Sequence, residues 1–252
     1  MEKYINRGKS FTRRLSGTEI ALGYLVALPA FMFCCVYLAT ALVKFVCLMI
    51  GNSVDYYLIN MTVNLVNDAI MAVVCLFIFR KFFKRNLKDF KKKWPTYVFV
   101  GIVLGYILCI VGDTVGNLVL RLFTTTTTSV NQSSISSLSH QYPIFMIIMT
   151  CFLAPITEEL LFRGLVFTSI RKYSRVWAYV ISALLFGFIH VMDTVLAGNM
   201  SELVQMIPYC FMGLVFAYMY ETTDNICTSM LTHMAQNAVA MIVLLRSAGF
   251  FG

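Results

Sequence analysis

Long apolar segments run through most of this sequence, and they leave few folds open to it. The chain has 252 residues, 59% of them hydrophobic and 13% charged, and its mean hydropathy is +0.78. About 20 consecutive apolar residues can cross a bilayer as a helix, because the hydrocarbon core is about 30 Å thick. Several segments exceed that length. We therefore predict an all-α fold, a polytopic bundle of transmembrane helices in the cell membrane.

The pattern predicts about seven spans. They cover residues 20–50, 57–79, 97–123, 143–170, 176–192, 203–220 and 226–245. The Thr/Ser-rich segment between the third and fourth spans is expected to be a solvated connector with room for a short helix. We divide the chain into a basic cytoplasmic tail (1–17), N-terminal transmembrane helices (18–142) and a C-terminal helical core (143–245).

Most of the lysine and arginine residues, 16 of 20, lie on one side of this arrangement. If the N-terminus is inside, the inside segments hold five cations in the tail, eight after the second span and three after the fourth. The outside loops hold none. This distribution follows the positive-inside rule, so we predict that the N-terminus is inside. The net charge of +8 then reflects topology and contacts with anionic lipids, and we expect no nucleic-acid partner.

The fourth span contains two adjacent carboxylates, Glu158 and Glu159. The apolar part before them, residues 144–156, is too short to cross a bilayer alone. A crossing here must therefore carry both glutamates into the membrane, where each costs at least about 2.5–3.5 kcal/mol on insertion scales and usually marks a functional site. The alternatives are a structural ion pair between helices, or a shorter span with the glutamates among the headgroups.

Glu159 and Arg163 are four residues apart, so they share a helix face and can pair. Glu158 points about 100° away from Glu159 and has no local partner. An unpaired carboxylate in an apolar setting seeks water, a proton or a metal, which suits a general base. Pro155 and Gly164 bracket the pair, and the proline frees a backbone carbonyl.

Two histidines and an asparagine lie in the later spans. They are His190 in the fifth span, and His233 and Asn237 on one face of the seventh. Each histidine alone could be a structural hydrogen-bonding residue. Together with the glutamates, these groups supply a base, oxyanion donors and metal ligands, as amide hydrolysis requires. The sequence contains no His-Glu-x-x-His zinc motif and no Gly-x-Ser-x-Gly nucleophile elbow.

At this point the chain resembles a known family, the CPBP intramembrane proteases (CAAX proteases and bacteriocin-processing enzymes, or Abi family), which includes the Rce1-type prenyl-protein proteases. The resemblance covers roughly residues 143–245. Its three motifs stand in this sequence as Glu158-Glu159-x-x-x-Arg163, Phe186-x-x-x-His190 and His233-x-x-x-Asn237. The resemblance implies that Glu158 activates the attacking water with help from His190. It also implies that His233 and Asn237 stabilise the oxyanion.

Two features of the implied site stay open. The resemblance has Glu159 orient the site through Arg163, and it equally admits a zinc enzyme whose ligands are Glu158, His190 and His233.

We expect the site residues to converge on one water-accessible cavity that opens toward the basic residues after the fourth span. Counting from the ends of the spans, however, puts Glu158 and His190 at depths that differ by about 10 Å.

The leading hypothesis is an endopeptidase acting on a membrane-associated peptide or protein, such as a peptide pheromone or bacteriocin precursor. One alternative is a non-proteolytic membrane scaffold for bacteriocin immunity or for regulation of a sensor kinase. Another is an ion or proton transporter, which would also use buried glutamate and histidine. The sequence identifies neither the substrate nor the oligomeric state.

Overall fold

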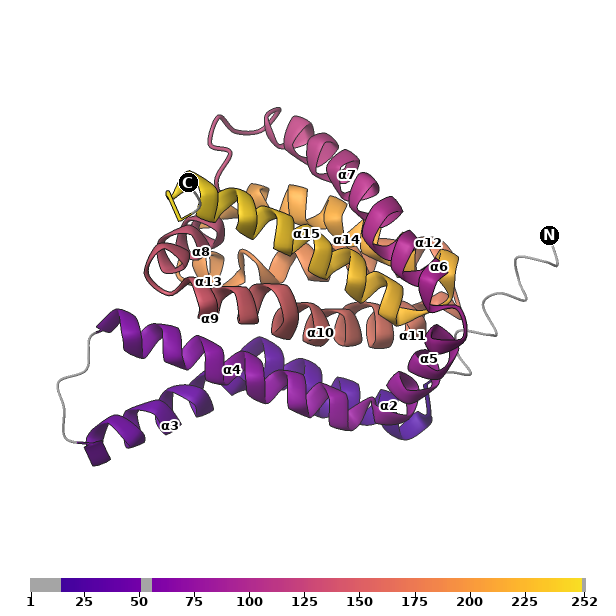
Figure 1. Cartoon of the computed structure of the whole chain (residues 1–252), viewed down its shortest axis with the longest axis horizontal. Helices are drawn as coiled ribbons and strands as arrows, with labels where there is room; N and C mark the ends of the chain where they lie inside the picture. Colours follow the sequence, from indigo (N-terminus) through magenta and orange to yellow (C-terminus); the bar gives the residue numbers. More distant parts are fainter. Residues whose placement is uncertain (1–14, 51–55, 251–252) are drawn as a thin grey trace.

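The computed structural model describes residues 15–50 and 56–250. Helices make up nearly all of this part of the chain, and it contains no strand (Figure 1). The all-α prediction is confirmed. The predicted basic tail, residues 1–17, lies almost entirely outside the described residues.

Six helices among the described residues are long and apolar enough to cross a membrane. They are Gly17–Met49, Tyr57–Ile78, Trp94–Leu120, Pro143–Arg171, Met200–Thr223 and Ile226–Ser247. The predicted fifth span is a shorter apolar helix, Arg175–Ile189. Its 15 residues reach only about 22 Å, less than the bilayer core. It is shorter than expected because the chain turns at His190, whose N–H bonds the Gly187 carbonyl. The protein is a multi-pass membrane protein.

The first half of the chain forms a pair of long helices, a short basic helix, a third long helix and a short polar helix. Its helices are α2 (Gly17–Leu22), α3 (Cys35–Ile50), α4 (Tyr56–Ile78), α5 (Arg80–Lys92), α6 (Trp94–Phe99), α7 (Gly105–Leu120) and α8 (Val130–Gln141). Helices α2 and α3 belong to one long rod, with the π-helical turns η1 (Gly23–Ala27) and η2 (Ala30–Cys34) between them. The connector after α7 therefore contains a helix of its own, capped by the side chain of Ser129.

The second half contains the helices that carry the predicted motifs. They are α9 (Pro143–Ile148), η4 (Met149–Leu153), α10 (Ala154–Glu158), η5 (Glu159–Phe167), α11 (Thr168–Arg171), α12 (Arg175–Ile189), α13 (Met192–Leu196), η6 (Met200–Gln205), α14 (Met206–Thr223) and α15 (Ile226–Ser247). Elements α9 to α11 are one rod, of which η4 and η5 are π-helical stretches. π-Helical turns are rare and often lie at functional sites.

Helix α14 lies at the centre of the bundle, packed against α7, α12 and α15. Small residues allow α12 to approach it closely. A Cβ atom at Gly187 would lie 2.9 Å from the carbonyl oxygen of Met206, and one at Gly213 would lie 3.0 Å from the Cα of Ala183. Small residues at such crossings are typical of membrane helix pairs. The close approach places the end of α12, and with it His190, directly against α14.

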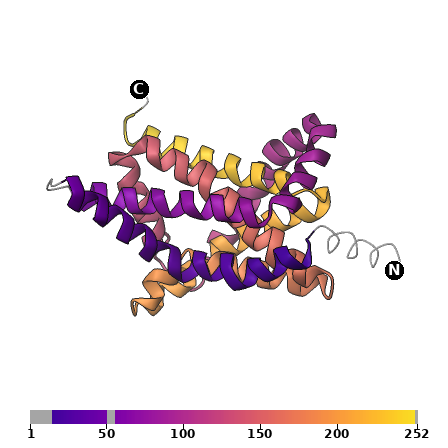
Figure 2. The same cartoon turned by 90° about the horizontal axis from the view of Figure 1, so that it is seen from below.

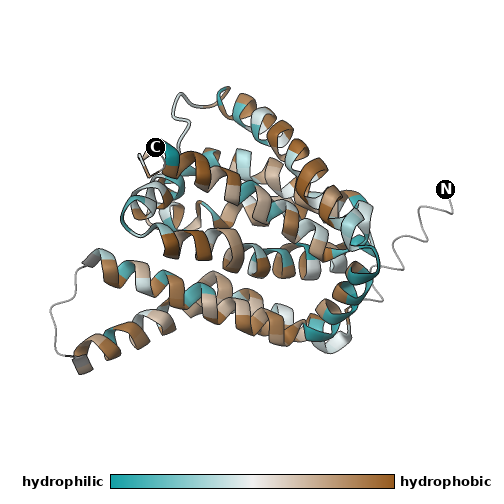
Figure 3. Cartoon of the chain, viewed as in Figure 1, coloured by the Kyte–Doolittle hydropathy of each residue, from teal (hydrophilic) through white to brown (hydrophobic). Residues whose placement is uncertain are grey.

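The two ends of the bundle differ in polarity. Helix α5, the most polar in Figure 3, buries Phe82 and Asn86 and exposes its basic side chains. Asn86 anchors α5 beneath the turn between α14 and α15, because its side chain accepts from Ile226 N–H and its carbonyl accepts from Asn225. Figure 1 shows α5, α6 and α11 at this basic end and α8 and α13 at the opposite end.

Helices from both sides of the predicted boundary at residue 142 share one hydrophobic cluster. It includes Cys75 of α4 and Phe79, which follows α4, together with Leu160, Phe216 and Met230. Figure 2 shows the long first rod beside α4, and its η1 turn also contacts η5. The division of the chain at residue 142 stays a prediction about where the motifs begin.

Candidate active site

The glutamate pair lies where the fourth rod changes from α to π geometry. Glu158 ends α10 and Glu159 begins η5. The predicted ion pair is present: Arg163 Nη1 lies 3.0 Å from Glu159 Oε1, and both side chains are fully buried. Such a pair requires further hydrogen bonds to offset the loss of hydration.

Arg163 finds those further contacts in the aromatic core. Its Nη2 donates to the carbonyl oxygen of Gly213 at 2.9 Å. Its guanidinium also lies over the rings of Phe186, at 4.4 Å, and Phe216, at 5.1 Å. These cation–π contacts stabilise the buried charge. Phe186 is the residue that precedes His190 in the second motif. In the structure its ring packs against the guanidinium of Arg163.

Glu159 is the centre of a hydrogen-bond network. Ser229 Oγ donates to its Oε2 at 2.5 Å, and His233 Nδ1 lies 3.2 Å from its Oε1. Since an ionised carboxylate only accepts, His233 carries its proton on Nδ1 at this contact. Sequence reasoning missed Ser229; its spacing of four from His233, on the same face of α15, is the signal that could have found it.

Glu158 differs from its neighbour. The residue is 8% exposed, and its buried Oε2 has no hydrogen-bond partner. The nearest basic atom is His233 Nε2 at 3.9 Å, too far for a hydrogen bond. His233 thus bridges the pair, bound to Glu159 through Nδ1 and facing Glu158 through Nε2.

His190 is held by two contacts that fix its ring. Its Nδ1 lies 2.8 Å from the Phe186 carbonyl oxygen, which can only accept, so Nδ1 carries the proton and Nε2 is left as an acceptor. The ring of Tyr209 stacks on it at 4.3 Å between centroids, as Phe216 stacks on His233 at the same separation. Tyr209 and Phe216 are seven residues apart on α14, two turns along one face. Sequence reasoning missed both, because α14 is apolar on all sides.

Asn237 donates through Nδ2 to the carbonyl oxygen of Thr150 at 2.7 Å. The reason lies in the π-helical turn η4, where Ala154 N–H bonds the Met149 carbonyl five residues earlier. Continued by one residue, that pattern would pair Thr150 with Pro155, which has no N–H. The proline therefore leaves the Thr150 carbonyl to Asn237. One amide hydrogen of Asn237 remains for another acceptor.

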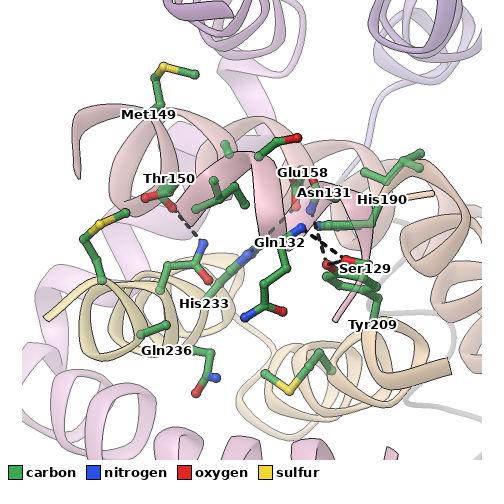
Figure 4. A pocket seen from close by; sticks show the side chains of 18 of the residues that line it. Ser129, Asn131, Gln132, Met149, Thr150, Glu158, His190, Tyr209, His233 and Gln236 are labelled. Carbon is green, nitrogen blue, oxygen red and sulfur yellow. Dashed lines mark hydrogen bonds and ion pairs between the residues drawn. The ribbon is translucent and has the colours of Figure 1, made fainter. Parts of the chain in front are cut away.

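The predicted residues from three helices meet at one cavity of about 890 Å³. Glu158, His190, His233 and Asn237 all line it, and Figure 4 shows Glu158, His190 and His233 gathered in its interior. Glu159 and Arg163 are fully buried and lie behind the side chains that line the cavity. Helix α8 contributes Asn131 and Gln132, and Tyr209 hydrogen-bonds to Ser129 and Asn131 at that edge (Figure 4).

The depth conflict disappears when both helices are measured from the turn that joins them. Glu158 lies about 20 Å before Arg171, and His190 lies about 22 Å after Arg175, at about 1.5 Å per residue. The two side chains therefore reach one level. The sequence-based estimate counted from the far end of the fourth rod, which at 29 residues is longer than the bilayer core.

The expected direction of the cavity is wrong. Neither Arg171, Lys172 nor Arg175 lines it. Instead Arg171 Nε and Arg175 Nη2 lie 2.6 and 2.8 Å from carboxylate oxygens of Glu221, so both cations are bound at the basic end of the bundle. The cavity extends toward α8 and α13, at the end that sequence reasoning places outside.

The described residues contain no preformed zinc site. Among the described residues, no three His, Cys, Asp or Glu side chains are grouped so that they could hold a metal ion. A zinc site built from Glu158, His190 and His233 would thus require these side chains to move together. Both histidines do donate through Nδ1, the arrangement that prepares Nε2 as a ligand or an acceptor.

Comparison with known proteins gives a consistent result. Residues 140–239 match the family described as Type II CAAX prenyl endopeptidase Rce1-like, a range that contains all six predicted site residues. "Putative membrane peptidase YdiL" of Bacillus subtilis is 26% identical over 176 residues, which cover 69% of this chain and 68% of that protein. "UPF0177 protein YvdC" of Lactococcus lactis is 23% identical over 155 residues, or 62% of this chain and 56% of that protein. No solved structure matches the chain. The resemblance predicted from the three motifs is confirmed.

Proposed function

This chain is related to the Rce1-like membrane peptidases, and on that basis we propose that it is an intramembrane endopeptidase in which Glu158 activates water. One observation carries the proposal. Glu158, His190, His233 and Asn237 come from three helices and line a single cavity, and the carboxylate of Glu158 has a buried oxygen without a hydrogen-bond partner. A general base needs an available oxygen within reach of water.

In the proposed reaction, Glu158 takes a proton from a water molecule, and the water oxygen attacks the carbonyl carbon of a peptide bond. His190 orients that water, because its Nε2 is an acceptor once Nδ1 is bonded to Phe186. Glu158 then returns the proton to the leaving nitrogen, so one peptide bond is replaced by a carboxylate and an amine. The substrate is a membrane-associated peptide or protein, such as a peptide pheromone or bacteriocin precursor.

The developing oxyanion is stabilised by donors from α15. Asn237 has one amide hydrogen left after its bond to Thr150. His233 keeps its Nδ1 proton toward Glu159 and faces Glu158 through Nε2, so it would join Asn237 as a donor once Nε2 takes up a proton. Glu159 and Arg163 position His233 from behind and touch no reacting atom.

The proposal is tested with purified protein in detergent, a mixture of synthetic peptides with apolar ends, and mass spectrometry of the products. We expect cleavage by the unsubstituted protein and a loss of at least about 10²-fold in Glu158→Gln, the low end of the effect of a positioned base. Glu158→Gln keeps the size of the side chain, so the unfolding temperature should not change. Equal rates for the two proteins would rule out the role given to Glu158.

A chelator distinguishes the two chemical versions of the mechanism. Cleavage that persists after treatment with a strong zinc chelator is the expected result for a glutamate base acting alone. Cleavage that stops, and returns on addition of zinc, would instead assign Glu158, His190 and His233 to a metal.

A further inference from the structure

The aspartate and glutamate side chains that line the cavity are not matched by any described lysine or arginine in the lining. Four carboxylates line it, contributed by α4, α7, α10 and α13: Asp68, Asp113, Glu158 and Asp193. Within residues 15–50 and 56–250, no lysine or arginine lines it, although the whole chain has 20 of these residues against 12 Asp and Glu. A third of all the acidic residues therefore face one cavity, without a described lysine or arginine beside them.

Several basic residues are held away from the cavity lining by identified contacts, and others are exposed at the basic end. Arg163 is enclosed behind the wall by Glu159 and Gly213. Arg171 and Arg175 are bound to Glu221 at the far end of the bundle. The cations of α5 are exposed at that same end. The ion pairs described for Arg163, Arg171 and Arg175 are with Glu159 and Glu221, and none is with a carboxylate that lines the cavity.

The carboxylates are spread along the cavity. No three acidic, histidine or cysteine side chains among the described residues are grouped to hold one metal ion. Asp68 accepts from Asn67, and Asp113 accepts from Asn117, so each is oriented by a neutral amide of its own helix. Separate carboxylates with amides between them match a ligand that carries several positive charges at intervals along a chain.

Glu158 provides an independent sign that a ligand enters. Its side chain is 10% exposed, lines the cavity, and leaves Oε2 buried without a hydrogen bond. Apolar walls of low dielectric strengthen the field of such carboxylates and attract cations into the cleft. A peptide that neutralises them is favoured over an acidic peptide of equal length.

We propose that the cavity binds a peptide segment carrying lysine or arginine side chains, so that the substrates are basic near the bond that is cut. This proposal deepens the proposed endopeptidase function and rests on it. Charge would then select among membrane-associated peptides that share an apolar character, and Asp68, Asp113 and Asp193 would act as specificity-determining residues.

The test measures binding, which does not depend on cleavage. Three fluorescent peptides share one apolar frame and differ at four central positions, which are all lysine, all glutamine or all glutamate. Anisotropy is measured on the purified full-length protein in a non-ionic detergent. We expect the lysine peptide to bind at least about 10-fold more tightly than the glutamate peptide at low salt, with the difference shrinking in high salt.

Single substitutions locate the effect. Asp113→Asn and Asp193→Asn should each reduce the preference for lysine by about 3-fold, the order expected for one charge partly exposed to water. Asp89→Asn is the matched control, since it removes the same charge from α5, outside the cavity, and should leave the preference unchanged. Equal binding of the lysine and glutamate peptides would overturn the proposal, and so would equal effects of all three substitutions. Cleavage of the same peptides is scored separately, so a protein that selects lysine without cutting would count against the endopeptidase function alone.

Discussion

Arg163 is buried completely, yet it carries a full charge, and its surroundings explain how. The guanidinium bonds Glu159 and the Gly213 carbonyl and lies over the rings of Phe186 and Phe216. Removing one member of such a pair leaves the other charge buried alone, which costs about 3–5 kcal/mol.

We therefore expect Arg163→Ala to lower the unfolding temperature in detergent strongly. Glu159→Gln combined with Arg163→Ala should be less destabilised than Arg163→Ala alone, because no charge is then left without a partner. Lys92→Ala is the control: its ion pair with Asp89 is exposed and should contribute no more than about 1 kcal/mol. Simple additivity of the two substitutions at the buried pair would contradict the coupling.

The fourth rod shows how one proline shapes an element. Pro155 lacks an N–H, and the π-helical turn before it leaves the Thr150 carbonyl to be satisfied from α15 by Asn237. This bond joins two helices at the level of the site. It also fixes which amide hydrogen of Asn237 remains for another acceptor.

Two paired substitutions can test whether Pro155 is the reason that Asn237 bonds the Thr150 carbonyl. Asn237→Leu should lower the free energy of unfolding by about 1–3 kcal/mol, the cost of a buried acceptor left unpaired. In a Pro155→Ala background the same substitution should cost less, because the introduced alanine has an N–H that can bond the Thr150 carbonyl. An unchanged cost in the Pro155→Ala background would show that the proline is not the reason for the Asn237 contact.

Across the bundle as a whole, charge separates a basic end from a cation-poor end. The site cavity extends toward the second, between α8 and α13. The positive-inside rule places this end at the outer side of the membrane, so we expect the cavity to open outward.

Cysteine labelling with a membrane-impermeant maleimide checks this orientation. Ser134→Cys on α8 should react in intact cells, because Ser134 lines the cavity and is exposed. Lys88→Cys on α5 should react only after the cells are opened. The unsubstituted protein, with its eight native cysteines, supplies the background. Labelling of Lys88→Cys alone in intact cells would reverse the predicted topology.

The helical membrane class could be predicted from the order of residues alone, and so could the polar side chains that the structure brings to the candidate cavity. Apolar length decides whether a helix can cross a bilayer, and a glutamate pair within such a length is too costly to be incidental. The i, i+4 spacing of Glu159 and Arg163 was enough to predict their ion pair, because that contact lies within one helix.

Contacts between helices, in contrast, were set by the packing of the bundle. The stacking of Tyr209 on His190, the bond from Ser229 to Glu159 and the binding of Arg171 by Glu221 each join side chains far apart in the chain. No local periodicity encodes such contacts, since they depend on how closely small residues such as Gly187 and Gly213 let the helices approach. The direction of the cavity was missed for the same reason. Glu221 of α14 binds Arg171 and Arg175 at the basic end, and these ion pairs form only once the bundle is packed.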